Sequence, residues 1–388
     1  MTDDPGAAAG PYQPADVPPA EFLLSPEQRD FAATLSSYLE RHHGHDDLRR
    51  GLDGAGAGDE QRWRRMADEL ALPAALAPAD CGGLGFGALE AMVIAQELGR
   101  VLYRGPWLAS CVLAGTALST AGGPEVAGLL AAIASAQSTA CLADDEVITG
   151  QRVPEAPTAE SDGAGDHVLH GRARFVLDGA TADHVLVLAQ DGDGGSLYQV
   201  GERGRMSVMP LETLDPTRPM AAITFDATPA TRLGPPGASV AIRQAVHQLA
   251  GLASAAEALG GMERCLDMAT EYARTRIQYG RPIGSFQAIK HKLADLLVLV
   301  EFTRTAVQHA AWSVSAADVD AALAVHVAQV QASSAYLRVT GENIQVHGGI
   351  GFTYDHDAHL YFRRAKSMQL LFGSPDYHRD RIADLVGI

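Results

Sequence analysis

Residues 271–297, EYARTRIQYGRPIGSFQAIKHKLADLL, combine a charged helix end, a sharp corner and the start of a second helix. Gly280 can adopt backbone conformations that other residues resist, and Pro282 prevents a simple continuation of the first helix. After Ser285, apolar residues recur at helical spacing as Ile289, Leu293, Leu296 and Val300. The stretch therefore predicts two long helices that meet at a corner rich in arginine and aromatic side chains. Such a corner could bind an anionic, ring-bearing ligand, or it could be an ordinary helical corner with solvated arginines.

Two signatures, one at this corner and one downstream, carry a family resemblance. The first consists of Arg276, Ile277, Gln278, Tyr279, Gly280, Arg281, Pro282 and Ile283, followed by Phe286 and Gln287. The second consists of Gln345, Val346, His347, Gly348, Gly349, Ile350, Gly351 and Phe352, with Arg363, Arg364, Ala365 and Lys366 beyond it. Both resemble signatures of the acyl-CoA dehydrogenase family, in the family's order. The resemblance implies FAD as cofactor, contacted by Arg276, Tyr279, Phe286, Gln287, Gln345, Val346, His347, Gly348 and Gly349.

Length and composition limit the function classes. A chain of 388 residues suggests two or three domains with a sizeable core. A formal net charge of −17 argues against a general binder of nucleic acid or of anionic membranes. Apolar runs stay shorter than the roughly 18–20 residues of a membrane-spanning helix. The four cysteines are scattered and the histidines show no metal-ligand spacing, so we expect no metal and a cytoplasmic location.

The order of the predicted elements indicates an α+β architecture. Residues 1–20 are acidic and rich in proline and glycine, which predicts a disordered tail. Residues 21–136 form a predicted N-terminal helical domain, whose first helix starts at a capping box formed by Ser25 and Gln28. Residues 137–236 form a predicted β-domain. Its expected strands are 167–176, 183–189, 196–200 and 221–225.

Residues 237–388 are predicted to form a C-terminal four-helix bundle, because long amphipathic segments alternate with short connections. The expected helices are 240–275, 285–314, 318–347 and 358–371. The resulting order, helical, β and helical, agrees with the architecture that the resemblance implies.

The chemistry implied by the resemblance needs a carboxylate base. In the family, a glutamate removes the α-proton of an acyl thioester while the β-hydride goes to flavin, and such a base contributes roughly 10²–10⁴-fold in rate. Most members place this glutamate before a Gly-Thr pair near the C-terminus, where this chain has Phe372 before Gly373. A minority place it on the first bundle helix, where this chain has Ala250, beside Gly251 in place of an arginine that contacts CoA. Glu257, two turns further on, is a candidate base, although a buried or interface glutamate is the simpler interpretation.

The part of the flavin site that the family builds from the β-domain also differs. Where the family has a Thr-Glu-Pro-Gly-x-Gly-Ser loop, this chain has CLADDE at residues 141–146, and three acids would repel a diphosphate. The flavin-packing Trp-x-Thr element reads Phe175, Val176 and Leu177. The retained signatures, in contrast, are those that the resemblance places across a dimer interface, on the flavin of the neighbouring subunit.

We therefore expect one subunit of a heteromeric FAD-dependent dehydrogenase, with α2β2 stoichiometry. It would introduce an α,β double bond into an acyl thioester of CoA or of a carrier protein, and a paralogous partner would supply the glutamate. Two alternatives remain open. One is an active homodimer that uses another acid, Glu257 or Asp376, as its base. The other is a non-redox scaffold subunit that retains the fold without flavin.

Overall fold

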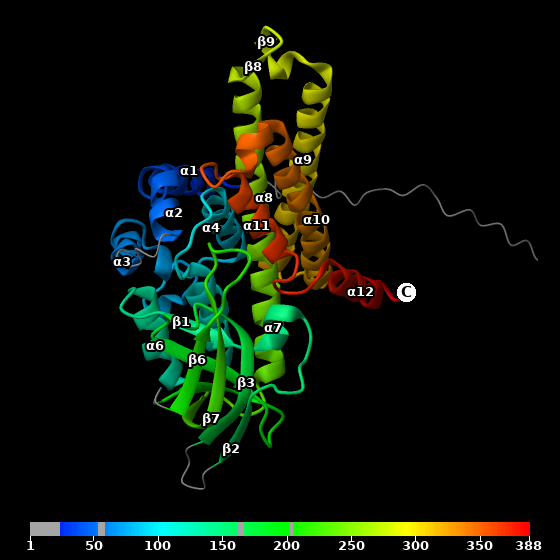
Figure 1. The fold of residues 1–388 in the computed structure, drawn as a ribbon. Helices are drawn as coiled ribbons and strands as arrows, with labels where there is room; N and C mark the ends of the chain where they lie inside the picture. Colours follow the sequence, from blue (N-terminus) through cyan, green and yellow to red (C-terminus); the bar gives the residue numbers. More distant parts are fainter. Residues whose placement is uncertain (1–23, 53–58, 162–166, 202–204) are drawn as a thin grey trace, which may run out of the picture.

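A computed structural model describes residues 24–52, 59–161, 167–201 and 205–388. The tail expected at residues 1–20 lies outside these ranges. Within them, N-terminal helices, a β-sheet and long C-terminal helices follow one another along the chain (Figure 1). This order confirms the predicted α+β fold class. No helix in the described ranges is long and apolar enough to cross a membrane.

The N-terminal part is helical. Its main helices are α1 (Pro26–His42), α2 (His45–Leu52), α3 (Asp59–Leu70), α4 (Ala88–Arg100), the π-helix η4 (Trp107–Ala114), α5 (Gly115–Ala121) and α6 (Pro124–Ala134). The predicted capping box is present, because the Ser25 hydroxyl accepts from the Gln28 amide and the Gln28 side chain accepts from the Ser25 amide. Helix α4 contacts the C-terminal helices directly: a Cβ at Gly260 would lie 1.8 Å from the carbonyl oxygen of Gln96.

The central part is a seven-stranded sheet in the order β1-β4-β5-β7-β3-β2, with β6 paired to β7. Its strands are β1 (Ala140–Ala143), β2 (Thr158–Ser161), β3 (His167–Leu177), β4 (His184–Ala189), β5 (Ser196–Val200), β6 (Met206–Pro210) and β7 (Met220–Leu233). The β1–β4 pair is parallel, and the other pairs are antiparallel. The four expected strands are present, but β1, β2 and β6 were not predicted. The four residues of β1 are all buried, so the strand lacks the alternation that reveals a half-buried strand.

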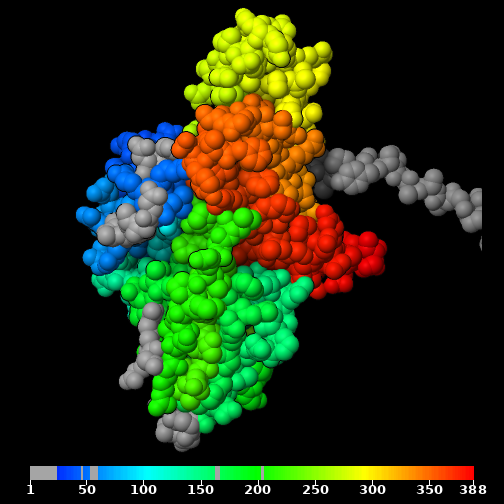
Figure 2. All heavy atoms as spheres, viewed as in Figure 1, coloured from blue at the N-terminus to red at the C-terminus, as the bar shows by residue number. Residues whose placement is uncertain are grey.

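The C-terminal part contains α8 (Ser239–Thr275), α9 (Gln287–Ser315), α10 (Ala321–His347), α11 (Ala358–Met368) and α12 (Pro375–Val386). Helix α8 has 37 residues and runs from the sheet to a hairpin formed by β8 (Ile277–Gln278) and β9 (Arg281–Pro282) (Figure 1). This hairpin projects from the rest of the molecule (Figure 2). The expected bundle helices are present, but α11 ends earlier than predicted and α12 was not predicted.

Candidate functional site

The hairpin after α8 carries the first signature on the surface. Arg276, Tyr279 and Gln287 are exposed, and Tyr279 is 92% exposed with φ of 50°. Phe286 is half-buried beneath the guanidinium of Arg281, whose Cζ lies 4.1 Å from the ring centroid. The hairpin therefore presents a cationic and aromatic surface to whatever lies next to it.

The segment after α10 carries the second signature. Gln345, Gly348 and Gly349 are exposed, and Cβ atoms added to the two glycines would meet no atom within 4 Å. Gly348 has φ of 63°, a conformation that favours glycine. Val346 and His347, in contrast, are buried. The two glycines therefore leave the backbone open to close approach by a ligand, whereas the side chains of Val346 and His347 face the protein.

His347 joins the two signatures. Its ring lies between Tyr272 and His356, with centroid distances of 4.5 and 4.3 Å. Its Nδ1–H donates to the carbonyl oxygen of Asn343 at 2.9 Å. Because Tyr272 lies on the last two turns of α8, this contact places the segment after α10 beside the base of the hairpin.

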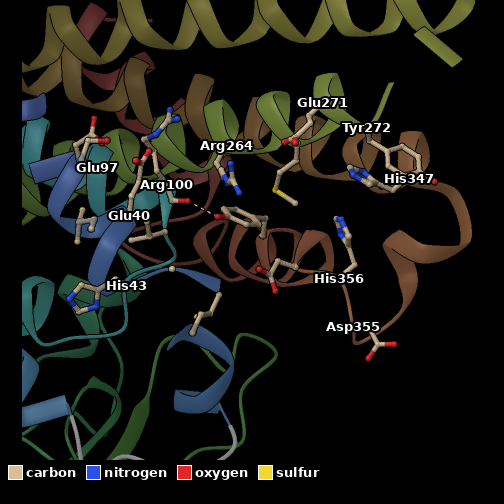
Figure 3. A pocket seen from close by; sticks show the side chains of 18 of the residues that line it. Glu40, His43, Glu97, Arg100, Arg264, Glu271, Tyr272, His347, Asp355 and His356 are labelled. Atoms are coloured by element: carbon tan, nitrogen blue, oxygen red, sulfur yellow. Dashed lines mark hydrogen bonds between the residues drawn. The ribbon is translucent and has the colours of Figure 1, made fainter. Parts of the chain in front are cut away.

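A cavity of about 590 Å³ lies on the inner side of His347 (Figure 3). Helices α1, α4 and α8 and the segment before α11 form much of its walls, which mix apolar side chains with the charged Glu97, Arg264 and Glu271. Burial raises the pKa of Glu97 above its usual value. Neither Phe372 nor Ala250 is among the lining residues, so this cavity does not reach the two family base positions.

Both base positions are closed by packing. Phe372 is fully buried between α11 and α12 with φ of 64°, and its amide donates to the carbonyl oxygen of Ile148 at 2.6 Å. Ala250 is fully buried on α8. At the neighbouring Gly251, an added Cβ would lie 2.9 Å from Cγ1 of Val325, so the arginine found there in the family has no room.

Glu257 lies in a buried ionic cluster that links the β-domain to the bundle. Its carboxylate accepts from Nη2 of Arg218 at 2.5 Å and also from Arg364. Arg364 in turn donates to Asp215 at 2.6 Å and to Thr217 at 3.0 Å. Burial opposes ionisation, but Arg218 and Arg364 hold the pKa of Glu257 below its usual value, and Arg364 does the same for Asp215. A carboxylate bound to two guanidinium groups is a poor proton acceptor, so this geometry argues against Glu257 as the base.

The other candidate base, Asp376, lies on the surface. Its side chain is 90% exposed and forms a pair with Arg379 at 2.7 Å on the first turns of α12. Such an exposed carboxylate cannot act on a thioester shielded from water.

The residues expected to repel a diphosphate are bonded within the chain. Asp144 receives hydrogen bonds from Arg243 and Val147, and Asp145 receives them from Arg174 and Phe175. This half of the site does not fit a flavin, whereas the exposed arginine and open glycines of the other half do. The sequence reasoning missed these internal partners and also Arg218, because the two members of each ion pair lie far apart in the chain and nothing in the sequence links them.

Comparison with known proteins identifies relatives over nearly the whole chain. Residues 25–135 match the family profile "Acyl-CoA dehydrogenase, N-terminal domain", and residues 237–387 match "Acyl-CoA dehydrogenase, C-terminal domain". The chain is 33% identical to acyl-CoA dehydrogenase IpdE2 of Mycobacterium tuberculosis over 357 residues, covering 91% of this chain and 95% of that protein. It is also 33% identical to acyl-CoA dehydrogenase FadE27 of the same organism, covering 81% of this chain and 85% of that protein.

Solved structures show the same similarity. The crystal structure of the ChsE4–ChsE5 complex from Mycobacterium tuberculosis matches with a TM-score of 0.84 at 30% identity, over 94% of this chain and 98% of that chain. A variant of the Tcur3481–Tcur3483 steroid acyl-CoA dehydrogenase matches with a TM-score of 0.82 at 28% identity, over 93% and 98% of the two chains.

Proposed function

The chain belongs to the acyl-CoA dehydrogenase family of FAD-dependent oxidoreductases, and within it we propose one subunit of a heteromeric enzyme. A paralogous partner supplies the catalytic glutamate and the β-domain half of the flavin site. This chain supplies the hairpin after α8 and the open segment after α10. The assembly dehydrogenates an acyl thioester in the cytoplasm, with an α2β2 composition.

The observation that carries this proposal is the character of the two family base positions. Phe372 and Ala250 are both fully buried and apolar, and neither can accept a proton. Removing a base of this kind costs roughly 10²–10⁴-fold in rate. Because Glu257 is bound by two arginines and Asp376 lies in the solvent, the described part of this chain offers no evident substitute. These features support a base supplied by another subunit.

The exposed residues of the hairpin after α8 and of the segment after α10 support the proposal that this chain binds the diphosphate end of FAD. The guanidinium of Arg276 can form two parallel hydrogen bonds with a diphosphate, and the exposed Tyr279 offers a flat face to a ring. Gly348 and Gly349 allow the backbone to approach closely. FAD, when bound there, supplies the hydride acceptor of the reaction. The residues of this chain would position its diphosphate end while the partner holds the flavin ring.

Two matched structures come from two-component assemblies, ChsE4–ChsE5 and Tcur3481–Tcur3483, and the second is described as a steroid dehydrogenase. These similarities favour a paralogous partner over self-assembly. They also favour a bulky acyl group such as a steroid side chain, carried on CoA or on a carrier protein.

The test is the flavin content of purified protein. The chain is expressed alone, and then together with each family member of the same genome that retains a glutamate before Gly-Thr. We expect a colourless chain alone, and a yellow complex with about one flavin per pair and thioester-dependent turnover. One flavin per chain and turnover by the chain alone would contradict the proposal and favour the homodimer. No flavin with any partner would favour the scaffold.

A further inference from the structure

Helix α7 (Asp145–Thr149) is a short helix between β3 and α8 (Figure 1). It follows β1 directly, where the family resemblance places the flavin-holding loop of the β-domain. Two other elements bind its backbone. The carbonyl oxygen of Ile148 accepts from the amide of Phe372 at 2.6 Å, and that of Glu146 lies 3.1 Å from Nε2 of His247 on α8. Helix α7 is therefore tied both to the segment that carries Phe372 and to the bundle.

The residues that flank α7 add two further contacts. Asp144, the N-cap, is buried and accepts from its own helix at the amide of Val147 and from Nε of Arg243 on α8, at 2.9 and 2.8 Å. At the other end, a Cβ on Gly150 would lie 2.9 Å from the ring of Tyr377 on α12. The space around α7 is thus filled by side chains of α8 and α12.

Asp145 binds the neighbouring strand. Its Oδ1 accepts from the amides of Arg174 at 2.8 Å and Phe175 at 3.1 Å, and its Oδ2 accepts from Nε of Arg174 at 2.9 Å. The register of β3 against β7 shifts between Ala173 and Val176, so the two amides between them fall outside the regular ladder and need another acceptor. The Asp145 carboxylate, only 1% exposed, is that acceptor.

We infer that Asp145 fills, from within the chain, the place that this fold offers to a flavin. Phe175 begins the element that the resemblance places against the flavin, and Arg174 directly precedes it. A carboxylate already binds the amides of both residues through charge-assisted hydrogen bonds. A flavin could enter only if α7 left β3, Arg243 and the Phe372 amide together. This inference rests on the proposed function and gives a structural reason for its one flavin per pair: the β-domain of this chain is closed by its own Asp145 and stays without flavin even when the partner is present.

An ordinary acidic residue at a helix start would not give this arrangement. Such a residue faces solvent or the amides of its own first turn, as Asp144 does by accepting from Val147. Asp145 instead crosses to a different element and satisfies two successive amides there. Its role is therefore to complete the irregular part of β3.

Amide hydrogen exchange tests the inference. In the wild-type chain, alone and in the complex, we expect slow exchange at the amides of Arg174 and Phe175. The Asp145→Ala variant should accelerate exchange at both by about tenfold or more, because the acceptor is lost. Glu146→Gln is the matched control: it removes the neighbouring acid, which is bonded to neither amide, and should leave both rates unchanged.

Titration with FAD separates this inference from the proposed function. Slow exchange at the amides of Arg174 and Phe175, together with one flavin per pair, would support the inference on Asp145 and the proposed function. Two flavins per pair, or amides protected only after FAD is added to the chain alone, would overturn the inference and leave the heteromeric enzyme possible. Fast exchange in the wild-type chain would overturn it as well. Slow exchange with no flavin in any complex would overturn the proposed function and leave the inference standing.

Discussion

The region around α7 and the hairpin after α8 are the two places that the family resemblance assigns to flavin, and they have opposite physical character. Around α7, the carboxylates of Asp144 and Asp145 and the amide of Phe372 are bonded within the chain. At the hairpin and after α10, Arg276 and Gly348 are exposed. In the proposed assembly, the groups of the first region are occupied by contacts within the chain, whereas those of the second are free to bind a ligand on a neighbouring subunit.

The largest effect is expected from an attempt to restore the base. Phe372→Glu places a carboxylate in a fully buried position, so it loses the packing of a large ring and adds an unpaired charge. We expect a loss of more than about 5 kcal/mol in the free energy of unfolding. We also expect no turnover by the chain alone with added FAD. Urea unfolding and a thioester-dependent dye-reduction assay measure the two outcomes.

Phe372→Leu is the matched control, because it retains an apolar side chain and should cost less than about 1.5 kcal/mol. Turnover by the Phe372→Glu chain alone would mean that the missing base is the only defect. The conclusion that the region around α7 is closed to a flavin would then be wrong.

The next largest effect is expected in the ionic cluster. Arg364→Met leaves Asp215 and Glu257 buried without their shared partner, at a cost of about 3–5 kcal/mol. The neighbouring Arg363 contacts the ring and hydroxyl of Tyr354 near the surface, so Arg363→Ala should cost less than about 1 kcal/mol. Chemical unfolding of both variants measures the difference. Equal losses would show that the cluster does not hold the β-domain to the bundle.

Changes at the hairpin should affect binding and leave stability intact. Arg276→Ala removes an exposed guanidinium, so the unfolding free energy should change by less than about 0.5 kcal/mol. The complex with the partner should bind FAD about ten- to a hundredfold more weakly, because a charged hydrogen bond contributes about 1.5–3 kcal/mol. Fluorescence titration with FAD measures this.

Arg64→Ala on α3 serves as the control, because Arg64 is also exposed and pairs at the surface with Glu60 of its own helix. If Arg276→Ala lost as much unfolding free energy as Arg364→Met, the hairpin would not differ from the buried part of the molecule in the way described. Unchanged FAD affinity would remove Arg276 from the proposed site.

A pH dependence of stability is also expected, and a partly buried histidine pair beside Gly373 contributes to it. His378 packs behind Gly373, and its Nδ1 lies 2.8 Å from Nδ1 of His326 on α10. Burial, aided for His378 by the neighbouring imidazole of His326, lowers the pKa of His326 to about 4 and that of His378 to about 3, from 6.5. As the pH falls below 6.5, the two histidines bind protons in the unfolded chain. In the folded chain they remain neutral down to about pH 4. Stability should be complete above pH 6.5 and fall between these values.

His326→Gln should reduce the proton uptake on unfolding by about one across this range, as read from the slope of unfolding free energy against pH. The exposed His309, changed to Gln, is the control. An unchanged slope in His326→Gln would show that the histidine pair ionises freely in the folded protein.

The sequence predicted the long helices within a few residues because their apolar periodicity extends over some 27–37 positions. It could not predict β1, which is short and buried throughout, or α12, whose sequence is largely polar. At the site, the prediction that Phe372 and Ala250 replace the base is compatible with their burial, and the flavin contacts implied by the resemblance remain a prediction. The acids at 144–146 were expected to repel a diphosphate, but their hydrogen-bond partners within the chain were not predicted.

These partners were beyond sequence reasoning because they join distant segments. Arg243 pairs with Asp144 across 99 positions, and Arg364 pairs with Asp215 across 149 positions. The periodicity that reveals a helix is a local property, whereas the choice between a solvated and a paired carboxylate depends on the final packing of separate elements. The same limit applies to Asp145. Its role as an acceptor depends on the register shift of β3 between Ala173 and Val176, which the sequence pattern does not predict.

The length of helix α8 sets the distance between the two regions. Arg243, which holds Asp144, lies near its start, and Arg276 follows its last residue, so the 33 positions between them span about 50 Å at 1.5 Å per residue. This distance exceeds the length of an extended flavin dinucleotide. A cofactor held by the hairpin would therefore not extend along α8 to the Asp144 region of the same chain. This length supports the proposal that the site of one copy is completed by a second molecule.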